Sequence, residues 1–310
     1  MNRPAHGGQG GVALILVLWT VALLTVIAGS FAYAMHIHVQ VLQNSVAIAR
    51  AQAAADAGVQ RALYEFFKPP NDLDRWRADG QMHETTLNGV RLRVSAIDES
   101  GKIDINTAAN ELLKGLFMSA GVKDEDADAV VDAVQDWRDN DSLKRLKGAE
   151  EDDYRAAGLK YVPANAPFQT IEELQLVLGM TPDVYRRIAD IITVYGRQPG
   201  LNVSIASRLA LLAIPGVTGQ QADEYIAQRD AARAADQPIP FFQPAARFAT
   251  AAYNLAFSIR AEARLDDDTV FVREAVAQIL PDPKRPYAFF AWKEGTPDIK
   301  QTEPTTHAEP

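Results

Sequence analysis

The feature that most constrains this chain is an uncharged apolar run near its N-terminus, residues 11–35, which reads GVALILVLWTVALLTVIAGSFAYAM. At ~1.5 Å per residue, these 25 residues are long enough to cross the ~30 Å hydrocarbon core of a bilayer as one helix. Apolar positions at helical spacing continue beyond the run, and Arg50 is the first charged side chain after it. We therefore expect one long helix that begins in a membrane, becomes amphipathic and ends near Phe67, before Pro69-Pro70.

Two other interpretations of this segment are a cleaved signal peptide and an ordinary signal anchor. A secretory signal peptide has a shorter apolar core and ends at a small-residue cleavage site, whereas this helical pattern continues. An ordinary signal anchor fits better. The short leader carries one firm positive charge, Arg3, which favours an orientation with the bulk of the chain outside the cytoplasm.

Composition excludes several classes of function. The 310 residues carry a net charge of −9, and such a surface repels nucleic-acid phosphates. The chain has no cysteine, so it contains no disulfide, thiol nucleophile or thiolate metal site. An exported domain without disulfides must be held together by its core or by a metal with oxygen ligands, such as Ca²⁺.

Strand patterns lie on both sides of a helical region. Residues 81–87 and 90–96 form a hairpin pattern around Asn88-Gly89, a strong turn signal, and strands are expected at 254–264, 269–280 and 287–293. Helical periodicity begins after Asp104, with Asn106 or Thr107 as the expected N-cap, and continues to about Tyr195. The fold class is therefore α+β, with an all-α domain inserted between the strands of an antiparallel sheet.

The inserted region contains an internal repeat of helix, glycine turn and helix. Residues 103–139 and 201–230 match each other, and 168–192 form a looser third copy. The unit resembles the helix-hairpin-helix (SAM-like) module, whose glycine turn can present backbone N–H groups to a phosphate. The alternative is that each glycine only supplies the positive φ of a tight turn, and the acidic chain and its anchor favour this interpretation.

Two acidic clusters, residues 136–141 (DWRDND) and 150–153 (EEDD), flank a short loop. Crowded carboxylates in a loop suit Ca²⁺, although Leu143 breaks the EF-hand spacing. The clusters also fit a solvated loop neutralised by Lys144, Arg145 and Lys147, and spacing alone does not decide between the two. A carboxylate pair for hydrolysis is a third reading, but no neighbouring motif indicates a substrate cleft.

Several short motifs together resemble one family. The chain starts with a short leader, a glycine and a long apolar helix. This start is similar to that of type IV pilins and pseudopilins. With it, an ordered series of motifs resembles the type II secretion system protein K family of minor pseudopilins: GVALI at 11–15, DESGKIDIN at 98–106, DWRDND at 136–141, GAE at 148–150, NAPF at 165–168, EEL at 172–174 and LGMT at 178–181.

The resemblance implies a pilin-like fold in which a long helix packs on an antiparallel sheet that carries the inserted helical domain. The expected organisation is a prepilin leader (1–11), a transmembrane helix (12–35), two pilin-like parts (36–100 and 241–293), the helical insertion (101–240) and a disordered tail (294–310). It also implies structural Ca²⁺ with ligands from Asp139, Asp141, Glu150 and Asp153. The basic segment 143–147 departs from the expected pattern between these ligands.

The resemblance further implies cleavage by a prepilin peptidase between Gly11 and Val12. Ordinary pilins then have glutamate at the fifth mature position, where this chain has Leu16. That glutamate is tolerated in the apolar core because it pairs with the N-terminal amine of the subunit above, so a subunit without it suits the tip.

The implied function is therefore a non-enzymatic minor pseudopilin that caps the pseudopilus tip and initiates its assembly for the export of folded proteins across the outer membrane. It would be anchored once in the inner membrane with its bulk in the periplasm. Its expected partners are the minor pseudopilins of types I, J and H, the major pseudopilin and the prepilin peptidase, and not nucleic acid. The alternatives are a membrane-anchored helix-hairpin-helix protein of the competence type, which binds nucleic acid, and an anchored periplasmic hydrolase.

Overall fold

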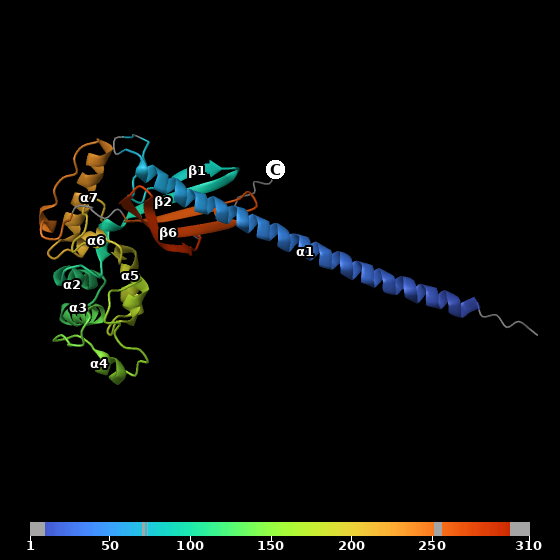
Figure 1. The fold of residues 1–310 in the computed structure, drawn as a ribbon, viewed down its shortest axis with the longest axis horizontal. Helices are drawn as coiled ribbons and strands as arrows, with labels where there is room; N and C mark the ends of the chain where they lie inside the picture. The colour runs from blue at the N-terminus through green and yellow to red at the C-terminus, as the bar shows by residue number, and fades with distance from the viewer. Residues whose placement is uncertain (1–9, 70–71, 73, 251–255, 298–310) are drawn as a thin grey trace, which may run out of the picture.

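The computed structural model describes residues 10–69, 72, 74–250 and 256–297, without the side chains of residues 10–13. Its longest element is the helix α1 (Gly10–Phe67). Figure 1 shows the first part of α1 extending away from the rest of the molecule, while its last part lies along a sheet. The predicted single long helix and its end at Phe67 are confirmed.

Small side chains let the C-terminal part of α1 lie close to the sheet. Its buried positions recur at helical spacing, and Gly58 faces Ala261 and Val94 so closely that an added Cβ would lie 3.0 and 3.1 Å from their side chains. The ion pair of Asp56 with Arg273 (2.6 Å) fixes the helix laterally. The buried α1 residues are Ala47, Ala51, Ala54, Ala55, Val59, Ala62, Leu63, Glu65 and Phe66.

The sheet is antiparallel throughout, with strand order β1-β2-β5-β6-β7. Asn88 and Gly89, both with positive φ, make the predicted turn between the first two strands. Alternate residues of β2, β5 and β6 face α1, and this side forms the first hydrophobic core. The strands are β1 (His83–Leu87), β2 (Val90–Asp98), β5 (Ala256–Arg264), β6 (Val270–Asp282) and β7 (Arg285–Glu294).

A helical domain with its own core is inserted between β2 and β5, as predicted. It lies at the end of the molecule opposite the N-terminal part of α1 (Figure 1). The short strands β3 (Ile103–Asp104) and β4 (Ile192–Thr193) pair in parallel at its base. Its helices are η1 (Glu99–Gly101), α2 (Asn110–Ser119), α3 (Asp124–Arg138), α4 (Glu151–Ala156), η2 (Ile171–Leu176), α5 (Pro182–Ile188), η3 (Ala189–Ile191), α6 (Arg208–Leu212), α7 (Gly219–Ala234) and η4 (Gln243–Ala245).

The predicted N-cap of the first inserted helix is wrong. The helix α2 begins at Asn110, and its N-cap is Ala109, whose side chain makes no capping hydrogen bond. Asn106 instead exchanges two hydrogen bonds with the backbone of Phe168 (2.9 and 2.8 Å), and Thr107 donates to the carbonyl of Gln198 (2.7 Å). These side chains hold distant loops together, a role that local sequence does not reveal.

The expected domain boundary at residue 240 is not where the packing changes. Phe242, Ala245 and Phe248 belong to the helical core, because Phe242 stacks on Tyr225 (4.4 Å between centroids). The sheet resumes only at Ala256. Residues 1–9 of the predicted leader and residues 298–310 of the predicted disordered tail lie outside the described residues.

A buried carboxylate joins the two parts. Glu99, 2% exposed, directly follows β2. It accepts hydrogen bonds from the hydroxyls of Thr193 in β4 and Ser258 in β5 (2.6 Å to Ser258), and it pairs with Lys102 (2.7 Å). One side chain therefore connects the helical domain to the middle strand of the sheet.

Candidate functional site

The N-terminal part of α1 has the properties of a membrane anchor. It is the one helix of the described residues that is long and apolar enough to cross a membrane, and its most apolar window is not buried at all within the molecule. Gly11 and Val12, the predicted cleavage site, lie in the first turn of α1. Leu16 follows one turn later and is 62% exposed.

The acidic candidates lie where α3 ends and α4 begins. Asp136 in the last turn of α3 is completely buried, and Asp139 is the C-cap of that helix. Glu150 is the N-cap of α4 and is 8% exposed. Gly148 makes the close approach possible, because an added Cβ would lie 1.9 Å from Oδ2 of Asp136.

Local structure already engages two of the four predicted ligands. Asp153 accepts the backbone N–H of Glu150 (2.9 Å) as part of a capping box and pairs with Nζ of Lys144 (2.5 Å). Asp141 accepts the backbone N–H of Leu143 (2.8 Å) in a tight turn. Local structure therefore accounts for one acceptor oxygen of Asp141 and both oxygens of Asp153.

Three other oxygens near the two clusters lack a hydrogen-bond partner. Oδ1 of Asp139, Oε1 of Glu150 and Oδ1 of Asn165 are buried without a hydrogen-bond partner. Burial raises the pKa of Glu150, and the negative charges of Asp136, Asp139 and Asp141 raise it further. Among the described residues no three acidic or histidine side chains converge into a complete ligand set. Carboxylate and amide oxygens are donors that suit a hard cation such as Ca²⁺, and the oxygen of Asn165 is one that the spacing of acidic residues does not indicate.

The loop between the clusters carries its own cations. The Arg145 guanidinium lies 3.4 Å from both Asp136 and Asp139, and its backbone N–H also points to Asp136. Lys147 pairs with Asp128 (3.4 Å). On the same loop Leu143 and Leu146 are 78% and 94% exposed.

The glycines of the repeat supply the backbone conformation that the turns between helices require. Gly121, Gly179 and Gly216 all have positive φ, between 81° and 95°. In the last turn, Val217 N–H donates to the carbonyl of Ile214 (3.1 Å) and Thr218 N–H donates to Gln221 (2.9 Å). These amides are therefore not free to bind a phosphate.

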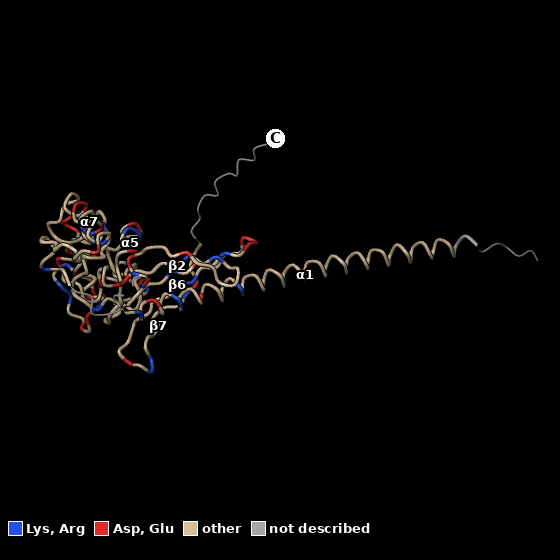
Figure 2. The backbone as a smooth tube through the Cα atoms, turned by 90° about the horizontal axis from the view of Figure 1, so that it is seen from above, with Lys and Arg blue, Asp and Glu red and all other residues tan. Residues whose placement is uncertain are grey.

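The charges around the repeat do not favour nucleic acid either. The Arg208 guanidinium, on the helix before the last turn, is held by Asp223 (2.6 Å). Figure 2 shows acidic and basic residues intermingled over the helical domain. A nucleic-acid-binding surface needs a continuous basic face instead.

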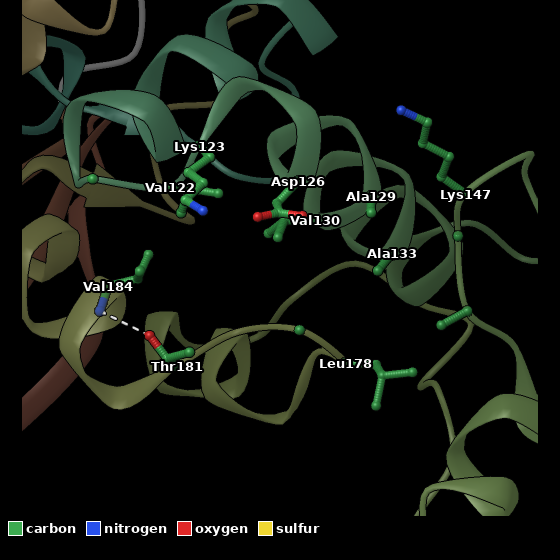
Figure 3. A pocket seen from close by; sticks show the side chains of 14 residues that line it. Val122, Lys123, Asp126, Ala129, Val130, Ala133, Lys147, Leu178, Thr181 and Val184 are labelled. Carbon is green, nitrogen blue, oxygen red and sulfur yellow. Dashed lines mark hydrogen bonds between the residues drawn. The ribbon is translucent and has the colours of Figure 1, made fainter.

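A groove of about 560 Å³ lies beside the acidic loop, between α3 and the start of α5. Figure 3 shows Ala129, Val130 and Ala133 on one side, with Leu178 and Val184 on the other. None of the four predicted ligands lines it. A carboxylate pair acting on a substrate bound in this groove is therefore not supported.

Comparison with known proteins agrees with this architecture. The family model for type II secretion system protein K matches residues 87–197, which include the acidic loop. Type II secretion system protein K of Pseudomonas aeruginosa is 26% identical over 243 residues, covering 72% of this chain and 73% of that protein, and the Klebsiella pneumoniae protein is 26% identical over 66% and 69%. The chain is therefore similar to type II secretion system protein K, both in the region that the family model matches and over about two thirds of its length.

The fold of this chain is also found in a solved structure. It is similar to a chain in the crystal structure of the GspK–GspI–GspJ complex of the enterotoxigenic Escherichia coli type 2 secretion system. The TM-score is 0.60 at 14% identity, and the match covers 80% of this chain and 96% of that chain. The predicted resemblance to protein K and the predicted α+β fold are therefore confirmed, and the apolar N-terminal helix of the described residues fits a membrane anchor.

Proposed function

We propose that this protein caps the tip of a type II pseudopilus, initiates its assembly and catalyses no reaction. The observation that carries the proposal is Leu16, an apolar residue at the fifth position counted from Val12. An internal subunit can neutralise a carboxylate there with the N-terminal amine of the subunit above. A tip subunit has no subunit above it, and an unpaired carboxylate in hydrocarbon is costly.

The shape of the molecule supports the same position. The helical domain lies at the end opposite the anchor, where it adds bulk above the sheet (Figure 1). Helices of further subunits would pack below it, along α1. The solved neighbour is a GspK–GspI–GspJ complex, so we expect pseudopilins of types I and J as direct partners, followed by type H and the major pseudopilin.

The test compares glutamate at two positions of the anchor. Leu16→Glu should reduce pseudopilus formation and secretion as strongly as Leu18→Glu, because at the tip neither carboxylate finds an amine. Both leucines are exposed on α1, at 62% and 70%, which makes the pair a matched comparison. Normal assembly with Leu16→Glu and failure with Leu18→Glu would place the protein inside the filament and overturn the tip position.

Processing by a prepilin peptidase is a separate part of the proposal. We expect the mature protein, purified from inner membranes, to begin at Val12, with its bulk in the periplasm. The intact mass and the N-terminal sequence test this. A chain that begins at Met1 would be an ordinary signal anchor, and the argument from Leu16 would lose its basis.

We further propose that Ca²⁺ stabilises the acidic loop. Asp139, Glu150 and Asn165 supply the unpartnered oxygens, and Asp141 supplies a further carboxylate. A bound cation would neutralise the carboxylates and join the end of α3 to the start of α4. Ca²⁺ should raise the melting temperature of the full chain in detergent, and Glu150→Gln should remove most of that increase. An unchanged melting temperature in the wild type would contradict calcium binding.

A further inference from the structure

The loop 143–147 places basic side chains against the carboxylates that are proposed to bind Ca²⁺. Two of its three cations contact carboxylates of the cluster, since Lys144 lies 2.5 Å from Asp153 and Arg145 lies 3.4 Å from both Asp136 and Asp139. A bound metal ion and a guanidinium beside the same carboxylate repel each other. A site that binds Ca²⁺ would therefore have to accommodate or displace Arg145.

Arg145 only partly neutralises the cluster. It reaches Oδ2 of Asp139, but Oδ1 of the same carboxylate is buried and unpartnered. Oε1 of Glu150 is also unpartnered, although the side chain is more than nine-tenths buried. A single guanidinium thus leaves two acidic oxygens without a partner, and these oxygens favour a cation of higher charge.

The side chain of Arg145 is free to leave this position. It is 43% exposed, and the loop carries Leu143 and Leu146 almost entirely in solvent. The loop is also held independently by the backbone N–H of Lys147, which donates to Asp132 (3.0 Å). The guanidinium can therefore move into water without unfolding the loop.

We propose that Arg145 is a built-in competitor for the cation at the Asp139–Glu150 cluster, so that Ca²⁺ binds only by displacing the guanidinium from Asp139. The inference rests on the proposed calcium site. Arg145 occupies the cluster when calcium is scarce and thereby keeps the domain folded. The same contact lowers the affinity, so the site responds to the calcium concentration around it.

Calorimetric titration of the calcium-depleted full chain in detergent tests the competition. Arg145→Gln removes the competing charge while keeping a polar side chain, and its Ca²⁺ dissociation constant should fall about tenfold. Arg145→Lys keeps the charge and should stay close to the wild type. Lys147→Gln is the matched control, because it removes one positive charge from the same loop, but from a side chain that contacts Asp128. Its dissociation constant should change less than about twofold.

Thermal unfolding provides a second readout, independent of the titration. Without calcium, Arg145→Gln should melt below the wild type, because Asp136 and Asp139 lose their counter-ion. With saturating calcium, the difference should shrink or reverse, so the calcium-induced increase should be larger than in the wild type.

The outcomes separate this inference from the calcium proposal itself. Equal affinity for Ca²⁺ in the wild type and Arg145→Gln overturns the competition but leaves the site intact. Weaker binding by Arg145→Gln also overturns it and shows that Arg145 positions the ligands. Absence of binding by the wild type and every variant overturns the calcium site.

Discussion

At the residue scale, Tyr154 provides a pH-dependent test of the helical core. Its ring is completely buried, its hydroxyl accepts the backbone N–H of Leu178 (2.9 Å), and burial raises its pKa to about 12. In the unfolded chain the phenol ionises near pH 10, so the folded state favours the neutral form. Stability from this group is complete below about pH 10 and is lost as the pH rises towards 12, by up to about 3 kcal/mol.

Urea unfolding of the full chain in detergent, from about pH 8 to pH 11, measures the slope with which the free energy of unfolding falls as the pH rises. Tyr154→Phe should flatten it, and at neutral pH the same variant should lose about 1 kcal/mol, because Leu178 N–H loses its acceptor. Tyr161→Phe is the control, since that side chain is 36% exposed. An equally steep slope in Tyr154→Phe would show that another group causes the alkaline loss.

Single residues also show where sequence reasoning reaches its limit. The spacing of acidic residues points to the segment between α3 and α4, which has Asp139 at one end and Glu150 at the other. It cannot tell that Asp153 serves as a capping residue, or that Asn165 brings a buried oxygen from a distant segment. Asn106 was expected to begin a helix and instead binds Phe168, 62 residues away. Such contacts depend on tertiary packing, which local patterns do not encode.

At the scale of elements, α2 lies so close to the C-terminal end of α6 that only glycine fits at the contact. An added Cβ at Gly115 would lie 2.0 Å from the carbonyl oxygen of Ala213. Gly115→Ala should therefore destabilise the domain by about 2 kcal/mol, even though alanine favours a helix. Gly216→Ala is the comparison, because its Cβ would meet nothing within 4 Å and its φ of +81° costs about 1 kcal/mol. Denaturant unfolding gives both values, and a larger loss at Gly216 would contradict the packing argument.

Elements themselves are the most predictable level of this fold. Asn88-Gly89 marks its hairpin because both residues adopt positive φ, and the repeat marks three glycine turns for the same reason. The boundary near residue 240 failed because proline-rich composition indicates irregular backbone, whereas Phe242 and Phe248 are buried in the helical core. Proline-rich composition indicates where the backbone is irregular, but it does not show which hydrophobic core the neighbouring side chains pack into.

At the scale of the whole molecule, the order of the elements was predictable because strands precede and follow the helical repeat. The way the two parts are joined was not, since Glu99 lies in a sequence motif that gives no indication of burial. Its carboxylate binds Ser258, 159 residues away, and Thr193, 94 residues away. Tyr195 of the helical domain also stacks on Phe290 of β7 (5.5 Å between ring centroids), so Glu99 acts together with aromatic packing at this junction.

Glu99→Ala should uncouple the two parts. The change leaves the Lys102 ammonium, 16% exposed, without its carboxylate, together with two hydroxyl groups, at a cost of about 3 kcal/mol. Tryptophans report each part separately, since Trp137 lies in the helical core and Trp292 lies on β7. One variant keeps Trp137 and another keeps Trp292, so that the fluorescence of each follows the urea unfolding of one part. With Glu99 present the two unfolding transitions should coincide, and in Glu99→Ala they should separate. Glu84→Ala, which removes a 73% exposed partner of Arg93 from β1, should leave them coincident. Coincident transitions in Glu99→Ala would mean that packing alone couples the helical domain to the sheet.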